Sequence, residues 1–172
     1  MKKKSSSLVI VVVAVIVAVL AFALPKLMSQ NEEAVSAEAG EKDVQNLSES
    51  EDLVIPLDKV TNNVTFYAVD VDGTEMEVMA VRDSSGNIRT AFNTCQVCYS
   101  SGRGYYQQEG NDLVCQNCGN SFTTDQVGLE SGGCNPVPIM DNDGKIDDTS
   151  ITISYDFLKN YKEIFAQWKT GF

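Results

Sequence analysis

The chain has 172 residues, with 24 acidic against 13 basic side chains, a formal net charge of −11, five cysteines and no histidine. Such an acidic surface repels phosphate backbones, so nucleic acid is excluded as a partner. No constellation of side chains for hydrolysis or group transfer stands out, so we do not expect a classical enzyme.

The N-terminus combines a basic start, Lys2–Lys4, with an uncharged apolar run, Leu8–Leu24. As a helix this run spans about 25 Å, close to the thickness of a bilayer core. We predict an uncleaved single-pass membrane anchor over residues 1–28, with its N-terminus in the cytoplasm and the rest of the chain outside. The alternative is a cleaved signal peptide that uses Ala21–Ala23 as its small-residue site.

Residues 29–52 are rich in Glu, Ser and Ala, lack aromatic side chains and show no sustained apolar face. This composition predicts a flexible acidic stalk. About 120 residues remain from Leu53 onward, enough for one domain with a modest core. We therefore expect one extracytoplasmic, cysteine-rich, metal-binding domain over residues 53–172.

The first part of this domain, Asn63–Phe92, alternates apolar and polar residues around two turn signals, one at residues 72–73 and one at residues 84–87. The pattern predicts three antiparallel strands, the third of which leads to Cys95. A second hairpin is predicted over Gly104–Val114, with its turn at residues 109–112, and it leads to Cys115.

The C-terminal part, Ser150–Trp168, predicts a short strand followed by a helix whose apolar side chains pack on the core. The acidic run Asp141–Asp148 resembles part of a calcium-binding loop, but Ile139 and Ser150 occupy the positions where acidic ligands are needed, so we expect a plain turn between strands. The predicted fold class is α+β: mainly antiparallel β with zinc-ribbon-like cysteine knuckles and a C-terminal helix, after an N-terminal transmembrane helix.

Four cysteines form two Cys-x-x-Cys pairs, Cys95 with Cys98 and Cys115 with Cys118. Each pair can form a tight turn with both sulfurs facing one ion, which is the pattern of a tetrahedral metal site. Glycines after each pair let the backbone turn back and aim amide groups at sulfur. Four thiolates suit zinc, iron, an iron-sulfur cluster or monovalent copper.

Two other uses of the thiols stay open. An exported domain can hold its cysteines as disulfides, although a bridge within either pair would close only a tiny loop and stabilise little. A thiol-redox site of thioredoxin type needs a cation or a helix N-terminus beside the thiolate. Arg103 is the one basic residue between Phe92 and Pro138, so this use has little support.

The fifth cysteine, Cys134, follows Gly132 and Gly133 and precedes Pro136 and Pro138. The glycines permit unusual backbone angles before Cys134, and the prolines restrict the backbone after it. The segment is therefore suited to holding the Cys134 sulfur in a fixed position. We predict that Cys134 lies beside the two pairs and contributes to the metal site. The alternative is a small buried side chain in a tight turn.

The run Ala91–Ile139 resembles the membrane iron-sulfur-containing proteins called FtrD-like. The resemblance rests on the two Cys-x-x-Cys pairs, the Gly-Tyr between them, the Cys-Gly and phenylalanine after the second pair, and the Gly-Gly-Cys-Asn-Pro segment before another proline. Asn93 stands where the family leads us to expect an acidic residue.

This resemblance implies an extracytoplasmic, membrane-bound protein with an iron-sulfur centre or iron as its cofactor. It also implies electron transfer linked to iron uptake, with a redox or iron-transport membrane partner. The alternatives are a structural zinc-ribbon-like binding module and a disulfide-stabilised or thiol-redox domain. The metal ligands expected are Cys95, Cys98, Cys115, Cys118 and Cys134.

Overall fold

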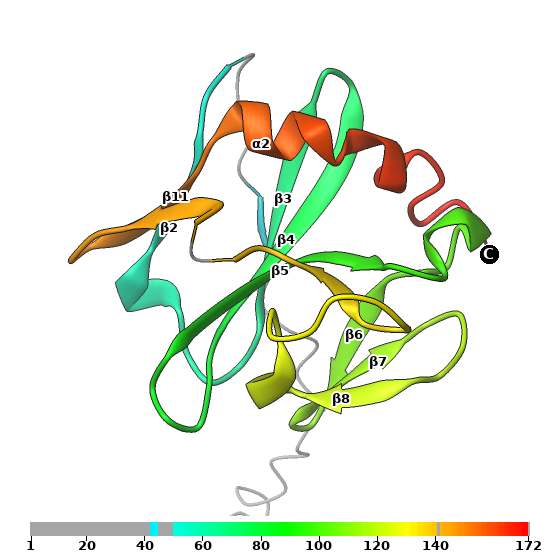
Figure 1. Cartoon of the computed structure of the whole chain (residues 1–172), viewed down its shortest axis with the longest axis horizontal. Helices are drawn as coiled ribbons and strands as arrows, with labels where there is room; N and C mark the ends of the chain where they lie inside the picture. The colour runs from blue at the N-terminus through cyan, green and yellow to red at the C-terminus, as the bar shows by residue number, and fades with distance from the viewer. Residues whose placement is uncertain (1–41, 45–49, 141, 172) are drawn as a thin grey trace, which may run out of the picture. The chain divides into compact units, whose positions relative to one another are not determined.

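The computed structural model describes residues 42–44, 50–140 and 142–171 (Figure 1). No helix within these ranges is long and apolar enough to cross a membrane. The predicted anchor at Leu8–Leu24 and most of the predicted stalk lie outside the described residues. The part of the stalk that is described differs from the prediction, because strand β1, Lys42–Val44, pairs in parallel with β3.

A five-stranded sheet in the order β1-β3-β4-β5-β9 forms the centre of the domain. Its middle strands are β3, Thr65–Val71, β4, Thr74–Arg82, and β5, Ile88–Cys95, which confirms the three predicted antiparallel strands. The β3–β4 turn places both of its residues in the left-handed region, with φ of 49° at Asp72 and 76° at Gly73. Strand β9, Pro136–Pro138, pairs antiparallel with β5.

Two smaller antiparallel sheets flank the central one. The first, in the order β10-β11-β2, joins Gly144–Ile146, Ser150–Ile153 and Leu53–Pro56. The acidic run, predicted as a plain turn between strands, contains strand β10 itself, and only its end forms the turn to β11. The second, in the order β6-β7-β8, joins Tyr106–Glu109, Asp112–Cys115 and Ser121–Thr123. The pairing of β6 with β7 confirms the second predicted hairpin.

Strand β4 is covered on both faces, which explains its nearly continuous apolar sequence. Met76, Val78 and Ala80 belong to one core, together with the C-terminal helix and the β10-β11-β2 sheet. Met79 and Val81 point the other way, into a core shared with the β6-β7-β8 sheet and the cysteines. Figure 1 shows α2 across one side of the central strands and β6, β7 and β8 toward the other.

The C-terminal helix is shorter than predicted. Helix α2 covers only Tyr155–Asn160, capped by Ser154, whose hydroxyl accepts a hydrogen bond from the Phe157 amide at 3.2 Å, and a 3₁₀ helix, Lys162–Phe165, follows. Apolar residues three and four positions apart face one side in either helix type, so the pattern specifies the buried face but not the hydrogen bonding.

Packing on Phe92 and one ion-pair cluster hold this segment to the sheet. The Phe92 ring lies 4.9 Å from the ring of Tyr161 and 5.7 Å from that of Phe165, which confirms the predicted apolar face. At the β3–β4 turn, the Tyr155 hydroxyl donates to Asp72 at 2.7 Å and Lys159 lies 2.9 Å from the same carboxylate. The tyrosine hydrogen bond, followed by that of the lysine, lowers the pKa of Asp72.

Candidate metal centre

The first cysteine pair lies where β5 ends. Cys95 is the last residue of the strand, and the Cys98 amide turns back to donate to its sulfur at 3.4 Å. The Cys95 amide in turn donates to the Gly104 carbonyl at 2.6 Å. A Cβ atom at Gly104 would collide with the Cys98 carbonyl, so glycine is what lets the returning backbone lie against this turn, as the sequence predicted.

The second pair repeats this arrangement at the end of β7. Cys115 is the last residue of the strand, and its amide donates to the Asn120 carbonyl at 2.9 Å. The Gly119 amide donates to the Cys115 carbonyl at 2.9 Å, with the glycine at φ 73°. This left-handed residue reverses the chain and keeps Cys118 beside Cys115.

The Cys134 loop is fastened to the first pair through Gln96. The Gln96 side chain accepts a hydrogen bond from the Gly132 amide at 2.7 Å and donates to the Pro136 carbonyl at 3.0 Å, so it holds both sides of the loop. Gly132 and Gly133 have φ of 97° and 65°, the unusual angles that the sequence suggested.

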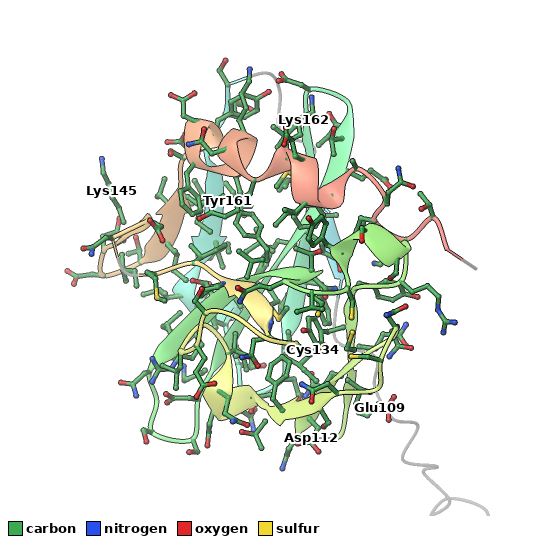
Figure 2. The ribbon with its side chains drawn as sticks, turned by 45° about the vertical axis from the view of Figure 1, so that its right-hand side comes forward. Glu109, Asp112, Cys134, Lys145, Tyr161 and Lys162 are labelled. Carbon is green, nitrogen blue, oxygen red and sulfur yellow. The ribbon has the colours of Figure 1, made fainter. Side chains whose placement is uncertain are left out.

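The sulfur of Cys134 lies among those of the two pairs. It is 3.6 Å from the sulfur of Cys95, 3.7 Å from that of Cys98 and 3.0 Å from that of Cys118. Figure 2 shows Cys134 above the β6-β7 hairpin, whose turn residues Glu109 and Asp112 are labelled. The structure therefore brings together the five cysteines that the sequence singled out.

These sulfurs form two groups of three, and within each group all sulfurs lie within 4.8 Å of one another. One group is Cys95, Cys98 and Cys115; the other is Cys98, Cys118 and Cys134. Sulfurs bound to one tetrahedral ion at about 2.3 Å are about 3.8 Å apart, close to two of the measured separations. All five cysteines are free thiols, so the donor set and its spacing fit a thiophilic metal.

Hydrogen bonds and burial give the five thiols different pKa values. The hydrogen bond with Cys134 lowers the pKa of Cys118 to about 7 and raises that of Cys134. Burial raises the pKa of Cys115 to about 12. Burial also opposes ionisation of Cys95, but hydrogen bonds to its sulfur, including that from the Cys98 amide, outweigh it and lower its pKa. The pKa is therefore lowered at Cys95 and Cys118 and raised at Cys98, Cys115 and Cys134, so binding of a metal would have to displace the protons that remain on the last three.

The comparisons with known proteins agree with this donor set. The family model described as "membrane iron-sulfur containing protein FtrD-like" matches residues 60–165, more than half of the chain and all five cysteines. The chain belongs to the FtrD-like family. No curated protein and no solved structure matches it.

Behind the centre of this FtrD-like chain, a buried carboxylate on β4 supports the first cysteine pair. Glu77, with 2% of its surface exposed, accepts a hydrogen bond from the Asn93 side chain at 2.6 Å and pairs with Lys169 at 3.3 Å. Asn93 also binds the backbone of Tyr106, accepting from its amide at 2.7 Å and donating to its carbonyl at 3.2 Å. Asn93, where an acidic residue was expected, thus lies beside the buried carboxylate of Glu77 on the neighbouring strand.

Tyr106 links this network to the fifth cysteine. Its hydroxyl donates to the Cys134 carbonyl at 2.9 Å, and the Asn120 side chain donates to the same oxygen at 3.1 Å. The sequence reasoning did not single out Tyr106, Asn120, Gln96 or Glu77. The nearest signal was the Gly-Tyr of the family pattern, which immediately precedes Tyr106.

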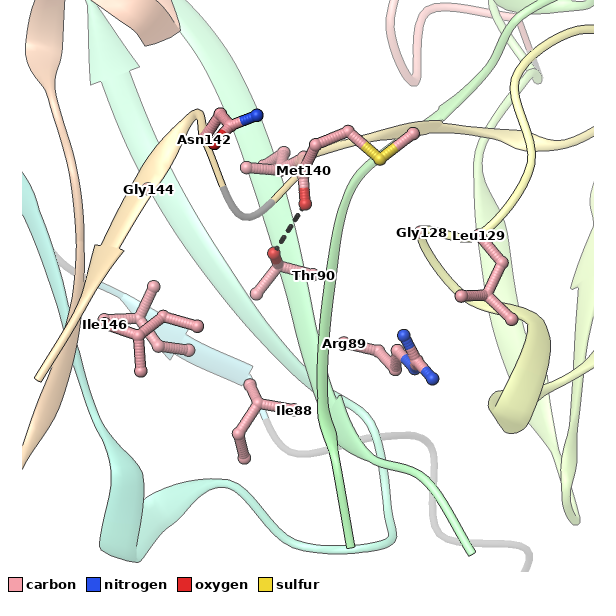
Figure 3. A pocket seen from close by; sticks show the side chains of 11 residues that line it. Ile88, Arg89, Thr90, Gly128, Leu129, Met140, Asn142, Gly144 and Ile146 are labelled. Carbon is pink, nitrogen blue, oxygen red and sulfur yellow. Dashed lines mark hydrogen bonds between the residues drawn. The ribbon is translucent and has the colours of Figure 1, made fainter. Parts of the chain in front are cut away.

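A cavity of about 390 Å³ lies between β5 and β10, away from the sulfurs (Figure 3). Both polar and apolar groups line it, with Ile88, Met140 and Ile146 among the apolar ones. The one basic side chain in the lining, Arg89, pairs with Asp83 at 2.9 Å. Both potential metal-ligating groups in the described part of the chain are made of the cysteines, so we place the chemistry of this FtrD-like protein there.

Proposed function

We propose that this FtrD-like chain is a membrane-anchored, extracytoplasmic protein whose five cysteines hold iron, as an iron-thiolate or iron-sulfur centre, and that it transfers electrons in a process linked to iron uptake. The observation that carries the proposal is the convergence of five free thiols on one site. Iron bound to thiolates changes oxidation state by one electron, and the protein sets its potential through burial and hydrogen bonds to sulfur.

The surroundings of the thiols suit electron transfer. Cys95 and Cys115 are buried, whereas Cys118 is exposed, so the centre reaches the surface on one side. Val97 and Tyr99, within and just after the first pair, expose 61% and 40% of their surfaces. A redox partner that docks over these apolar side chains would come close to the sulfurs, while Cys95 and Cys115 stay buried.

Two observations also fit the alternative functions of these cysteines, zinc binding and thiol-redox chemistry. The sulfur separations suit zinc as well as iron, which would make the domain a zinc-ribbon-like binding module. The separation of 3.0 Å between the sulfurs of Cys118 and Cys134 suits a thiol-redox pair.

The test is to purify the full-length chain anaerobically and to add reductant and oxidant in turn while recording its visible absorption. Iron-thiolate absorption that bleaches and returns supports the proposal. In cells, replacing Cys95 by serine should lower the uptake of radiolabelled ferrous iron, whereas the exposed substitution Gln107→Ala should not. A colourless zinc protein, or unchanged uptake with the Cys95→Ser chain, refutes it.

A further inference from the structure

A short segment far along the chain from the cysteines, Trp168–Gly171, lies against the first cysteine pair. The Trp168 ring nitrogen donates to the Asn93 carbonyl at 2.8 Å, just before the pair. The Gly171 amide donates to the Gly102 carbonyl at 3.1 Å, in the loop that follows the pair. Figure 1 shows this segment, in red, beside the green loop after β5. The segment therefore binds the backbone both before and after the first pair.

The contact with the loop is a close approach of two backbones. A Cβ atom on Gly102 would lie 2.5 Å from the Gly171 nitrogen, and one on Gly171 would lie 2.7 Å from the Ser101 carbonyl oxygen. Neither distance leaves room for a side chain, so both contacting residues must be glycine. Gly171 does not have a positive φ, so the close approach alone excludes a side chain there.

Lys169 fixes the middle of the segment. Its backbone lies in the left-handed region, with φ of 56°, which is uncommon outside glycine and persists only where the surrounding contacts hold it. Its ammonium group lies 3.3 Å from the Glu77 carboxylate, 4.0 Å from the centre of the Trp168 ring and 5.2 Å from that of Tyr105. Glu77 also accepts from the Asn93 side chain at 2.6 Å. The segment and the approach to the first pair thus share one buried carboxylate.

The turn of the second pair is packed less tightly. A Cβ atom on Gly119 would meet no atom within 4 Å beyond its chain neighbours. Cys118 is exposed, whereas Cys95 and Cys98 are buried. A centre that spans both pairs therefore has one part held by Trp168–Gly171 and another part open to solvent. Groups that hold the ligands in place contribute to metal affinity together with the ligands themselves.

We propose that Trp168–Gly171 is a positioning element of the metal centre. It holds the first pair in the arrangement that binds a metal ion, and it thereby slows the release of that ion. The segment lies outside residues 60–165, which the family model matches, so membership of the family does not by itself predict this role. The role rests on the proposed function only in that the cysteines bind a metal; it requires neither iron nor electron transfer.

The test follows the release of cobalt(II) from the full-length chain, loaded under anaerobic, reducing conditions. Cobalt(II) bound to thiolates absorbs visible light, and this absorption disappears when an excess of chelator removes the ion. Trp168→Phe keeps a ring but removes the donor to the Asn93 carbonyl, and Gly171→Ala forces the segment away from Ser101. Both should lower cobalt affinity about tenfold or more, seen as faster release, because supports of this kind contribute about 10–100-fold.

The matched control is Tyr155→Phe. It also removes one donor from an aromatic side chain, but at the β3–β4 turn, where the Tyr155 hydroxyl donates to Asp72 at 2.7 Å, and it should release cobalt at the wild-type rate. A role in stability alone predicts the same acceleration in this control as in Trp168→Phe. Lys169→Met should also speed release, and Lys169→Arg, which keeps a cation beside Glu77, should restore the wild-type rate.

The outcomes separate this role from the proposed function. Release at the wild-type rate from Trp168→Phe overturns the role, as does equal acceleration in Tyr155→Phe, and neither result depends on whether Gly171→Ala folds. A wild-type chain that binds no cobalt removes both the role and the proposed function. The expected rates in a chain whose native preparation lacks iron refute electron transfer alone and leave the positioning role in place.

Discussion

Replacing Asn93 by alanine should destabilise the domain by about 3–5 kcal/mol. The change removes the amide that binds Glu77 at 2.6 Å and the backbone of Tyr106 at 2.7 and 3.2 Å. Glu77 is 2% exposed and Tyr106 is 1% exposed, so water does not replace these bonds. Glu77 keeps its contact with Lys169 at 3.3 Å, but the Tyr106 amide and carbonyl both lose the Asn93 side chain. Each buried polar group left without its partner costs about 1–3 kcal/mol.

The assay is denaturant unfolding of the metal-free, full-length chain, followed by the fluorescence of its single tryptophan. That residue, Trp168, donates through its ring nitrogen to the Asn93 carbonyl at 2.8 Å, so it reports on this region, and the bond survives the substitution because it uses the backbone. The matched control, Gln107→Ala, removes an exposed amide and should change stability by less than about 0.5 kcal/mol. A loss for Asn93→Ala no larger than that of the control would refute the reasoning.

The same network predicts the effect of an acid at this position. Asn93→Asp would place a second carboxylate against that of Glu77, and like charges in a buried site repel, so it should destabilise more than alanine at neutral pH. Adding Glu77→Gln should recover much of the loss, because the carboxylate and the amide then exchange places. Failure of the double substitution to improve on Asn93→Asp would show that the pair does not act through this hydrogen bond.

Three further outcomes are expected. The pKa of Asp72 is lowered from 3.8, so its contribution to stability is present above that pH and is lost as the pH falls through the lowered value; thermal unfolding should show Asp72→Asn less stable at neutral pH and equal to wild type in strong acid. In the metal-free protein, alkylation of Cys118 should accelerate up to about pH 7 and then level off, while Cys115, with a pKa of about 12, stays slow; mass spectrometry that finds Cys115 labelled first would contradict this. Protease added to intact cells should remove the domain from Leu53 onward, whereas spontaneous release of a chain beginning near Leu24 would mean that the anchor is cleaved.

Local patterns in the sequence were sufficient for the hairpins. The alternation on β3 and β4 and the Asp72–Gly73 turn depend on neighbouring residues, and the structure confirms them. The pairing of β2 with β11 joins segments from opposite ends of the domain, and no local pattern specifies it. The short strand β1 lies in a polar segment whose composition predicts a stalk.

The candidate site divides in the same way. The spacing of the two Cys-x-x-Cys pairs predicts a metal site, and the glycines that follow them adopt the turns expected from the sequence. The approach of Cys134 depends on the pairing of β9 with β5 and on the Gln96 side chain, which act over a long separation in the chain. In the sequence, Glu77 occupies an ordinary polar position of a strand. The pairing of β4 with β5 in the structure shows that its carboxylate is buried beside Asn93.

The measurement that tests the central claim most directly is the metal and sulfide content of the anaerobically purified, full-length chain, together with its visible spectrum. We predict iron in the preparation, with thiolate-to-iron absorption that disappears in the Cys95→Ser and Cys115→Ser chains. A chain that contains zinc alone, or no metal, with all five thiols open to alkylation, would contradict the account.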